Sequence, residues 1–242
     1  MKSIALLGAA GAALFLVFPA LSGEIRTSPK AVIELFTSQG CSSCPKADAM
    51  FNELGKRQDV VALAWHVDYW DYIGWADTFG ARENSDRQRG YAESWGSARI
   101  YTPQMIVNGT AGVIGSHGDE VDEALGAAEL TLPVSMDLTT EALEITIGPR
   151  AGAQDATVWL VTFKDSSEVT IERGENAGST FDYTQIVTGK QMLGMWDADA
   201  GSQLKLPISA LRANGSNGAA ILVQSGTEEL PGAILGAASI QL

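Results

Sequence analysis

The sequence has few of the residues that build metal sites and disulfide frameworks. Its 242 residues include only two cysteines, Cys41 and Cys44, and only two histidines, His66 and His117. A disulfide-rich scaffold needs several cysteine pairs and is therefore excluded. A zinc site of the Cys₂His₂ type would need all four of these residues to converge.

Basic residues are also scarce. Lysine and arginine together number 16 against 29 aspartates and glutamates, which gives a formal net charge of −13. Such an acidic surface repels the phosphates of nucleic acids and the headgroups of anionic lipids. We therefore expect neither nucleic acid nor, after signal cleavage, a membrane as a partner.

Long hydrophobic runs are missing after residue 21. Before it, residues 4–21 are almost wholly apolar and follow the positive charge of Lys2, and Ala20-Leu21-Ser22 fits a cleavage site. This pattern favours a secretory signal peptide over residues 1–22 rather than an uncleaved anchor. We expect the mature chain in the periplasm or secreted, where disulfides persist.

The section from residue 23 to residue 130 mixes predicted strands and helices. Apolar runs predict buried strands at 31–36 and 60–70. Apolar residues that recur three and four positions apart predict one helix after the cysteines and another from Ser116. Asp119, three residues after Ser116, would complete a capping box. A polar stretch, 82–96, predicts a further helix. Asn108-Gly109 predicts a β-hairpin. This order indicates an α/β domain.

Residues 131–242 have a different pattern. Short runs of alternating polar and apolar residues, separated by Gly, Asn, Asp and Ser, predict strands and no helix. The polar segment that contains Arg173, Glu175 and Asn176 predicts a turn between two of these strands. We expect a second, all-β, sandwich-like domain packed against the first.

Three interpretations of Cys41 and Cys44 are open: a structural disulfide, a pair of metal ligands such as for copper, and a redox pair. A disulfide between residues so close constrains the unfolded chain little. The pair stands between a predicted strand and a helix that begins near Pro45, and a helix N-terminus stabilises a thiolate. We favour the redox interpretation, with Cys41 as the exposed attacking sulfur and Cys44 as the buried resolving one.

Several stretches resemble a family of secreted bacterial proteins that is thioredoxin-like and known as a domain of unknown function. The stretches are "VIELFTSQGCSSCPKAD", "WHVDYWDYIGW", "TPQMIVNG", "ERGENAG" and "YTQIV". The resemblance covers nearly all of the mature chain. It implies a thioredoxin fold for the first section, so that the whole chain would be an α/β thioredoxin-like domain followed by a β-sandwich.

A more distant resemblance to thioredoxin implies roles for three residues. Pro103 would be a cis proline that faces the cysteines, and the backbone of Thr102 would pair with an extended substrate peptide. The alternative for Pro103 is a trans proline at a strand start. Glu34 would be a buried acid that accepts the proton of Cys44, and its alternative is a place at a solvent-exposed strand edge.

Aromatic residues are concentrated between residues 65 and 101, where four of the six tryptophans lie. Tyr and Trp are common anchors at binding surfaces, so Tyr69 and Trp70 are candidates for contact with a substrate near Cys41. The alternative is a packed cover without a ligand. His66 lies in the same stretch and is interpreted first as a buried core histidine.

The sequence therefore predicts a thiol–disulfide oxidoreductase of the cell envelope that acts on protein thiols or disulfides through an unidentified redox partner. We expect no cofactor and no resident metal. The rival hypothesis is a binding module without catalysis, or a copper metallochaperone.

Overall fold

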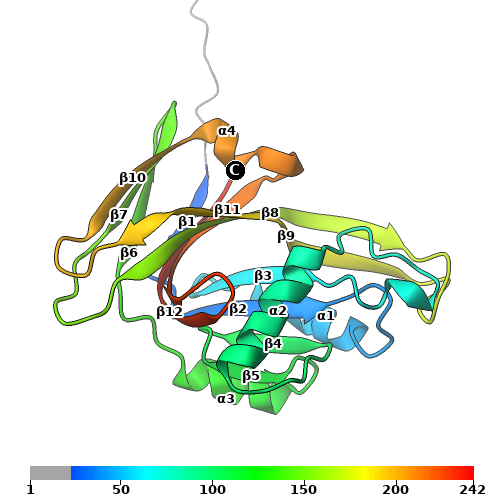
Figure 1. Ribbon diagram of the computed structural model, residues 1–242. Coiled ribbons are helices and arrows are strands. Elements are labelled where there is room, and N and C mark those ends of the chain that lie inside the picture. Colours follow the sequence, from blue (N-terminus) through cyan, green and yellow to red (C-terminus); the bar gives the residue numbers. More distant parts are fainter. Residues whose placement is uncertain (1–22) are drawn as a thin grey trace, which may run out of the picture.

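The computed structural model describes residues 23–242, and the predicted signal peptide lies outside the described residues. A large mixed sheet of nine strands forms the body of the molecule (Figure 1). Its spatial order is β1 (Glu24–Thr27), β12 (Pro231–Gln241), β11 (Gly218–Gly226), β8 (Ala156–Thr170), β9 (Thr180–Trp196), β3 (Val60–His66), β2 (Ala31–Thr37), β4 (Gln104–Val107) and β5 (Ala111–Ile114).

A second, three-stranded sheet covers one end of the large one. Its order is β10 (Ser202–Pro207), β7 (Ala142–Ile147) and β6 (Val134–Leu138). The helices are α1 (Pro45–Leu54), α2 (Arg82–Ser94), α3 (Gly118–Ala127) and α4 (Ile208–Leu211), with 3₁₀ turns at Asp71–Ile73 and Ala213–Gly215. Among the described residues, no helix is long and apolar enough to cross a membrane.

The predicted fold class, a thioredoxin-like α/β domain followed by an all-β sandwich, is wrong. Strands from before and after residue 130 belong to the same nine-stranded sheet, in which β9 lies beside β3 and the two pair in parallel at Ala64 and Ile186. The alternating pattern predicted most of the later strands correctly. It carries no information about which sheet a strand joins, because backbone pairing is decided by tertiary contacts.

Different helices pack against the two faces of the large sheet. Side chains alternate between these faces along each strand, and this alternation decides which residues meet which helix. Along β2, Ile33 and Leu35 pack with Phe51 of α1 and with α3. Val32 and Phe36 point to the other face and pack with Tyr91 of α2. This follows from the alternation of side chains in a strand.

A third core lies between the small sheet and the far end of the large one. Leu143 and Ile145 of β7 pack there with Trp196 of β9 and with Ile221 of β11. Some of the strands from β6 onward therefore extend the large sheet next to β3, and the others form the small sheet that covers it.

Several local predictions are confirmed. The β4–β5 hairpin forms around Asn108 and Gly109, both at positive φ, and α2 spans Arg82–Ser94 as expected. The predicted capping box of α3 is wrong: the helix begins at Gly118 after His117, and no side chain caps it. The short α4 was not expected.

Candidate functional site

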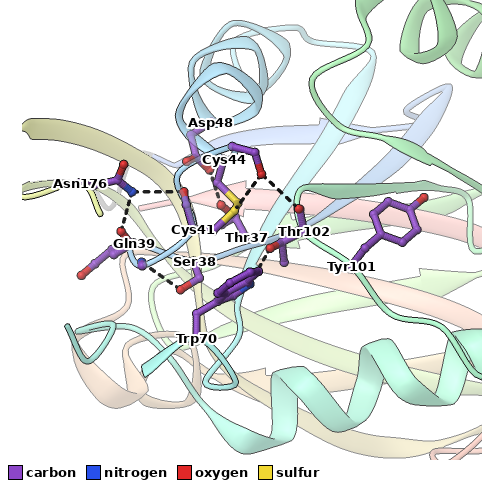
Figure 2. The surroundings of a disulfide bond; sticks show 12 residues. Thr37, Ser38, Gln39, Cys41, Cys44, Asp48, Trp70, Tyr101, Thr102 and Asn176 are labelled. Atoms are coloured by element: carbon purple, nitrogen blue, oxygen red, sulfur yellow. Dashed lines mark hydrogen bonds between the residues drawn. A yellow bond between two sulfur atoms is a disulfide. The ribbon is translucent and has the colours of Figure 1, made fainter. Parts of the chain in front are cut away.

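Cys41 and Cys44 form a disulfide at the junction between β2 and α1, with their Cα atoms 5.4 Å apart (Figure 2). The loop after Thr37 turns tightly, and the Cys44 N–H donates to the Cys41 carbonyl at 3.2 Å. Cys44 is the N-cap residue of α1, and Pro45 follows at its first position. Proline fits there because that position needs no N–H donor.

The disulfide is buried, which corrects the expectation of an exposed Cys41. Cys41 is 1% exposed and Cys44 is fully buried. The cover comes from a part of the chain that lies more than 130 positions away. The Asn176 amide donates to the carbonyls of Gln39 at 2.9 Å and Cys41 at 3.1 Å.

Asn176 belongs to the turn between β8 and β9, residues 171–179, which we call the hairpin tip. The tip rests on the segment between β3 and α2, residues 67–81, which lies beside the disulfide and which we call the aromatic loop. A Cβ added to Gly174, at φ 82°, would lie 3.3 Å from the Cβ of Trp75. Trp75 in turn donates through its indole N–H to Gln39 Oε1 at 2.8 Å. The hairpin tip and the aromatic loop thus form one cover over Gln39, Gly40 and Cys41.

Thr102 and Pro103 flank the other side of the disulfide. The peptide bond between them is cis, as the resemblance to thioredoxin implies. The Ser43 hydroxyl lies 3.3 Å from Cys41 Sγ and donates to the Thr102 carbonyl at 3.4 Å. The Trp70 indole donates to Thr102 Oγ1 at 2.7 Å. The structure therefore brings Cys41, Cys44, Trp70, Thr102 and Pro103 close together; their roles in a reaction stay predictions.

Glu34 is buried, but it does not lie at the disulfide. Because its side chain has the parity of Val32 and Phe36, it points to the α2 face of the sheet. There it accepts from Arg87 Nε at 2.7 Å and from the Tyr91 hydroxyl. Glu34 therefore has a structural partner in Arg87, and Cys44 lies on the opposite face of the sheet.

Tyr69 lies beside Trp70, with ring centroids 6.2 Å apart, and its hydroxyl donates to Gln88 of α2 at 3.0 Å. Burial raises the pKa of Tyr69 to about 12. The aromatic cluster thus divides. Trp75 contacts Gln39 of the cysteine loop, the buried Trp65 belongs to the core on the α2 side, and Tyr69 and Trp70 both pack against the edge of that core.

The carboxyl group on the cysteine side is Asp48, one turn into α1. It is 6% exposed, and it accepts from the Thr37 hydroxyl at 2.7 Å (Figure 2). Burial raises the pKa of Asp48 to about 7, against the opposing effects of nearby His66 and of the Thr37 hydrogen bond. An acid with that pKa can exchange protons near neutral pH.

His66 and Asp77 complete a buried polar cluster with Asp48. His66 Nδ1 lies 2.8 Å from Asp77 Oδ2, which also accepts from the Gln39 N–H at 2.8 Å. Burial opposes the charged forms of both partners. Burial is the largest single effect, but the attraction and hydrogen bond between the two, with help from Asp48 and from backbone N–H groups, together outweigh it, so the pKa of His66 is raised and the pKa of Asp77 is lowered. A buried His66–Asp77 pair therefore lies under the cysteine loop.

Sequence reasoning missed Asp48, Asp77 and the role of Asn176. Asp48 had a readable signal, because it follows Cys44 by four residues in a predicted helix and must share its face. The sequence carries no comparable signal for Asp77 and Asn176, because each is brought to the site by a contact with a residue that is distant in the sequence.

A separate cavity of about 700 Å³ opens on the α2 face. Trp65, Phe79, Arg87 and Lys190 are among its lining residues, and the cysteines are not. Within residues 23–242, no group of three or more His, Cys, Asp and Glu side chains is arranged to hold a metal ion.

Comparison with known proteins gives one match to a family and two matches to structures. A crystal structure of protein AGR_C_4864 from Agrobacterium tumefaciens is 37% identical, with a TM-score of 0.78, and the match covers 89% of this chain and 95% of that one. HBP35 of Porphyromonas gingivalis is 13% identical, with a TM-score of 0.57 and coverage of 89% and 76%, so that likeness concerns the fold alone. No curated protein matches. The family model for the protein of unknown function DUF1223 matches residues 32–224, and the chain belongs to this family.

Proposed function

We propose that the protein carries out thiol–disulfide exchange through Cys41 and Cys44. The observation that carries this proposal is the disulfide at the start of α1, built beside the buried carboxyl group of Asp48. A loop closed between residues three apart contributes little to stability, so chemistry is the better explanation for the bond.

In the reduced protein, the Cys41 thiolate attacks a disulfide of a protein substrate. A mixed disulfide forms at Cys41, and one substrate sulfur leaves as a thiolate. Cys44 then attacks Cys41 Sγ, which restores the Cys41–Cys44 bond and releases the second substrate sulfur. The same steps in reverse oxidise a substrate dithiol. The N-terminus of α1 favours a thiolate at this place, since its N–H groups carry partial positive charge.

The substrate needs access to Cys41, and the closed cover prevents it. We infer that the hairpin tip moves away from the loop before exchange. Its hold on the loop includes the two hydrogen bonds of Asn176 to backbone carbonyls. Because both are hydrogen bonds at the edge of the site, they can break without unfolding the sheet.

Thr102 is the proposed contact for the main chain of the substrate. Its carbonyl receives only the long bond from Ser43, and Thr102 is partly exposed. Trp70 holds the Thr102 side chain and so orients this segment. The predicted signal peptide supports a place in the cell envelope.

The test is to trap mixed disulfides in the native cell envelope. Replacing Cys44 with Ser removes the resolving thiol and leaves the attacking one, so Cys44→Ser protein is expected to accumulate covalent complexes that disappear on reduction. Cys41→Ser is the matched control, and it should trap few complexes. Non-reducing gels followed by mass spectrometry of the bands provide the measurement.

Equal trapping by both variants, or none by either, would contradict the proposal. In that case the disulfide would be a structural feature of the loop.

A further inference from the structure

We propose that Asp48 is the proton acceptor for Cys44 during resolution of the mixed disulfide, and the proton donor in the reverse direction. This inference rests on the proposed function, and it adds a residue and a proton path to it.

Burial of Cys44 creates the need for an internal acceptor. Its side chain is fully buried behind Cys41 at the start of α1, and a substrate attached to Cys41 would restrict water further, so we expect bulk water not to take the thiol proton. A thiol must become a thiolate before it attacks a disulfide. The proton therefore has to pass to a group on the protein.

Asp48 is in the right place to receive it. Cys44 is the N-cap residue of α1, and the Asp48 N–H donates to the Cys44 carbonyl at 3.0 Å. Residues four apart on a helix share one face, with their Cβ atoms about 5–6 Å apart. Figure 2 shows Asp48 next to Cys44, and the Thr37 hydroxyl donates to the Asp48 carboxyl group at 2.7 Å. Glu34, the only acid in β2, is on the opposite face.

The surroundings suit Asp48 to transfer a proton rather than to remain charged. Thr37 from β2 donates to it, and His66 from β3 attracts its charge, whereas Asp77 from the aromatic loop repels it. Tyr183 of β9 packs edge-on against His66, and burial raises the pKa of its phenol, so it stays neutral. With these groups and burial, the pKa of Asp48 is about 7.

The step balances as follows. Cys44 S–H gives its proton to the Asp48 carboxylate, and the resulting thiolate attacks Cys41 Sγ. The Cys41–Cys44 bond forms as the bond from Cys41 to the substrate sulfur breaks, and the substrate leaves as a thiolate. The substrate disulfide is reduced and the protein dithiol is oxidised. Asp48 then returns its proton to solvent when the site opens.

The experiment measures resolution in a single turnover with glutathione disulfide. Asp48→Asn keeps the size of the side chain and an acceptor for Thr37, but it cannot take a proton. We expect resolution at pH 7 to slow by about 10²-fold, the usual scale of general base catalysis. Glu53→Gln is the matched control, because Glu53 is exposed on the same helix and bonds only to Lys56. Its rate should equal that of the wild type.

The pH profile separates proton transfer from a merely structural role. The wild-type rate should rise through an inflection near pH 7, and Asp48→Asn should lose that inflection. His66→Gln removes the nearby positive charge, so it should raise the pKa of Asp48 and move the inflection to higher pH. Wild-type and Asp48→Asn profiles of the same shape would overturn the proposal.

A second measurement keeps this inference distinguishable from the proposed function. In Cys41→Ser protein, the Cys44 thiol is titrated directly by its ultraviolet thiolate absorbance. The Asp48 carboxylate should hold the pKa of that thiol high, and Asp48→Asn should lower it. An unchanged thiol pKa refutes the coupling. A lowered pKa together with no exchange between wild-type protein and glutathione disulfide refutes the proposed function alone.

Discussion

Asn176 provides the most direct test of how the disulfide is covered. Asn176→Ala removes the amide that donates to the carbonyls of Gln39 and Cys41 and leaves the rest of the hairpin tip in place. A hydrogen bond contributes about 1 kcal/mol net, so the two together contribute about 1–3 kcal/mol to the closed state. Since about 1.4 kcal/mol is a factor of ten, the open state should become about 5- to 150-fold more populated.

The assay is the rate at which dithiothreitol reduces the Cys41–Cys44 disulfide, followed by alkylation and mass spectrometry. Because the disulfide is buried, reduction requires the open state, and its rate should rise by the same factor. Glu175→Ala is the matched control: Glu175 is exposed on the same tip, and its side chain makes no hydrogen bond in the described structure. Equal rates for wild type and Asn176→Ala would refute the reasoning, as would an equal increase in Glu175→Ala.

Two further predictions concern buried carboxyl groups. Glu34→Gln breaks a buried ion pair with Arg87, so the free energy of unfolding in urea should fall by about 3–5 kcal/mol. The rate of disulfide reduction should not change in Glu34→Gln, because Glu34 faces α2, and a slowed reduction would contradict this placement. Glu144→Gln is the control for stability: it breaks an exposed ion pair and should alter the free energy of unfolding little. Asp48→Asn should be more stable than the wild type at pH 8, by up to about 4 kcal/mol, because the pKa of Asp48 rises from about 3.8 to about 7 on folding and the wild type loses stability as pH rises through that range. Urea melts at pH 4 and pH 8 test the sign, since the difference should vanish near pH 4, and a constant difference would rule out the pKa as its cause.

The Asp48 prediction connects stability and function. A carboxyl group that is costly to ionise inside the protein is retained beside the cysteines, where a proton acceptor is useful. Glu34 is buried even more completely, but Arg87 and Tyr91 provide it with partners. The two acids show why burial alone does not identify a catalytic group.

The C-terminal half of the chain contributes to the site itself. Strand β9 extends the sheet beside β3, and the preceding hairpin tip reaches the cysteine loop. The chemistry in residues 41–48 is therefore covered by a segment encoded more than 120 positions later. No local sequence pattern near the cysteines predicts this cover.

The sequence by itself determined the local features. The strand before the cysteines, the helix after them, the Asn108–Gly109 hairpin and the polar turn at Asn176 all follow from short-range rules of spacing, turn chemistry and helix starts. The spacing of Cys41 and Cys44 at a helix N-terminus favoured a redox pair over a structural disulfide or a metal site; a disulfide between the two is present, and its redox activity stays a prediction.

Only the tertiary structure decided how those elements assemble and which face each side chain meets. Glu34 and Thr37 differ in parity along β2, so one faces Arg87 and the other faces Asp48. The sheet to which β8 and β9 belong, the burial of Cys41 and the pairing of His66 with Asp77 depend on contacts between distant segments. Periodicity records that a residue is buried, but the partner that buries it is set by the packing of the whole chain.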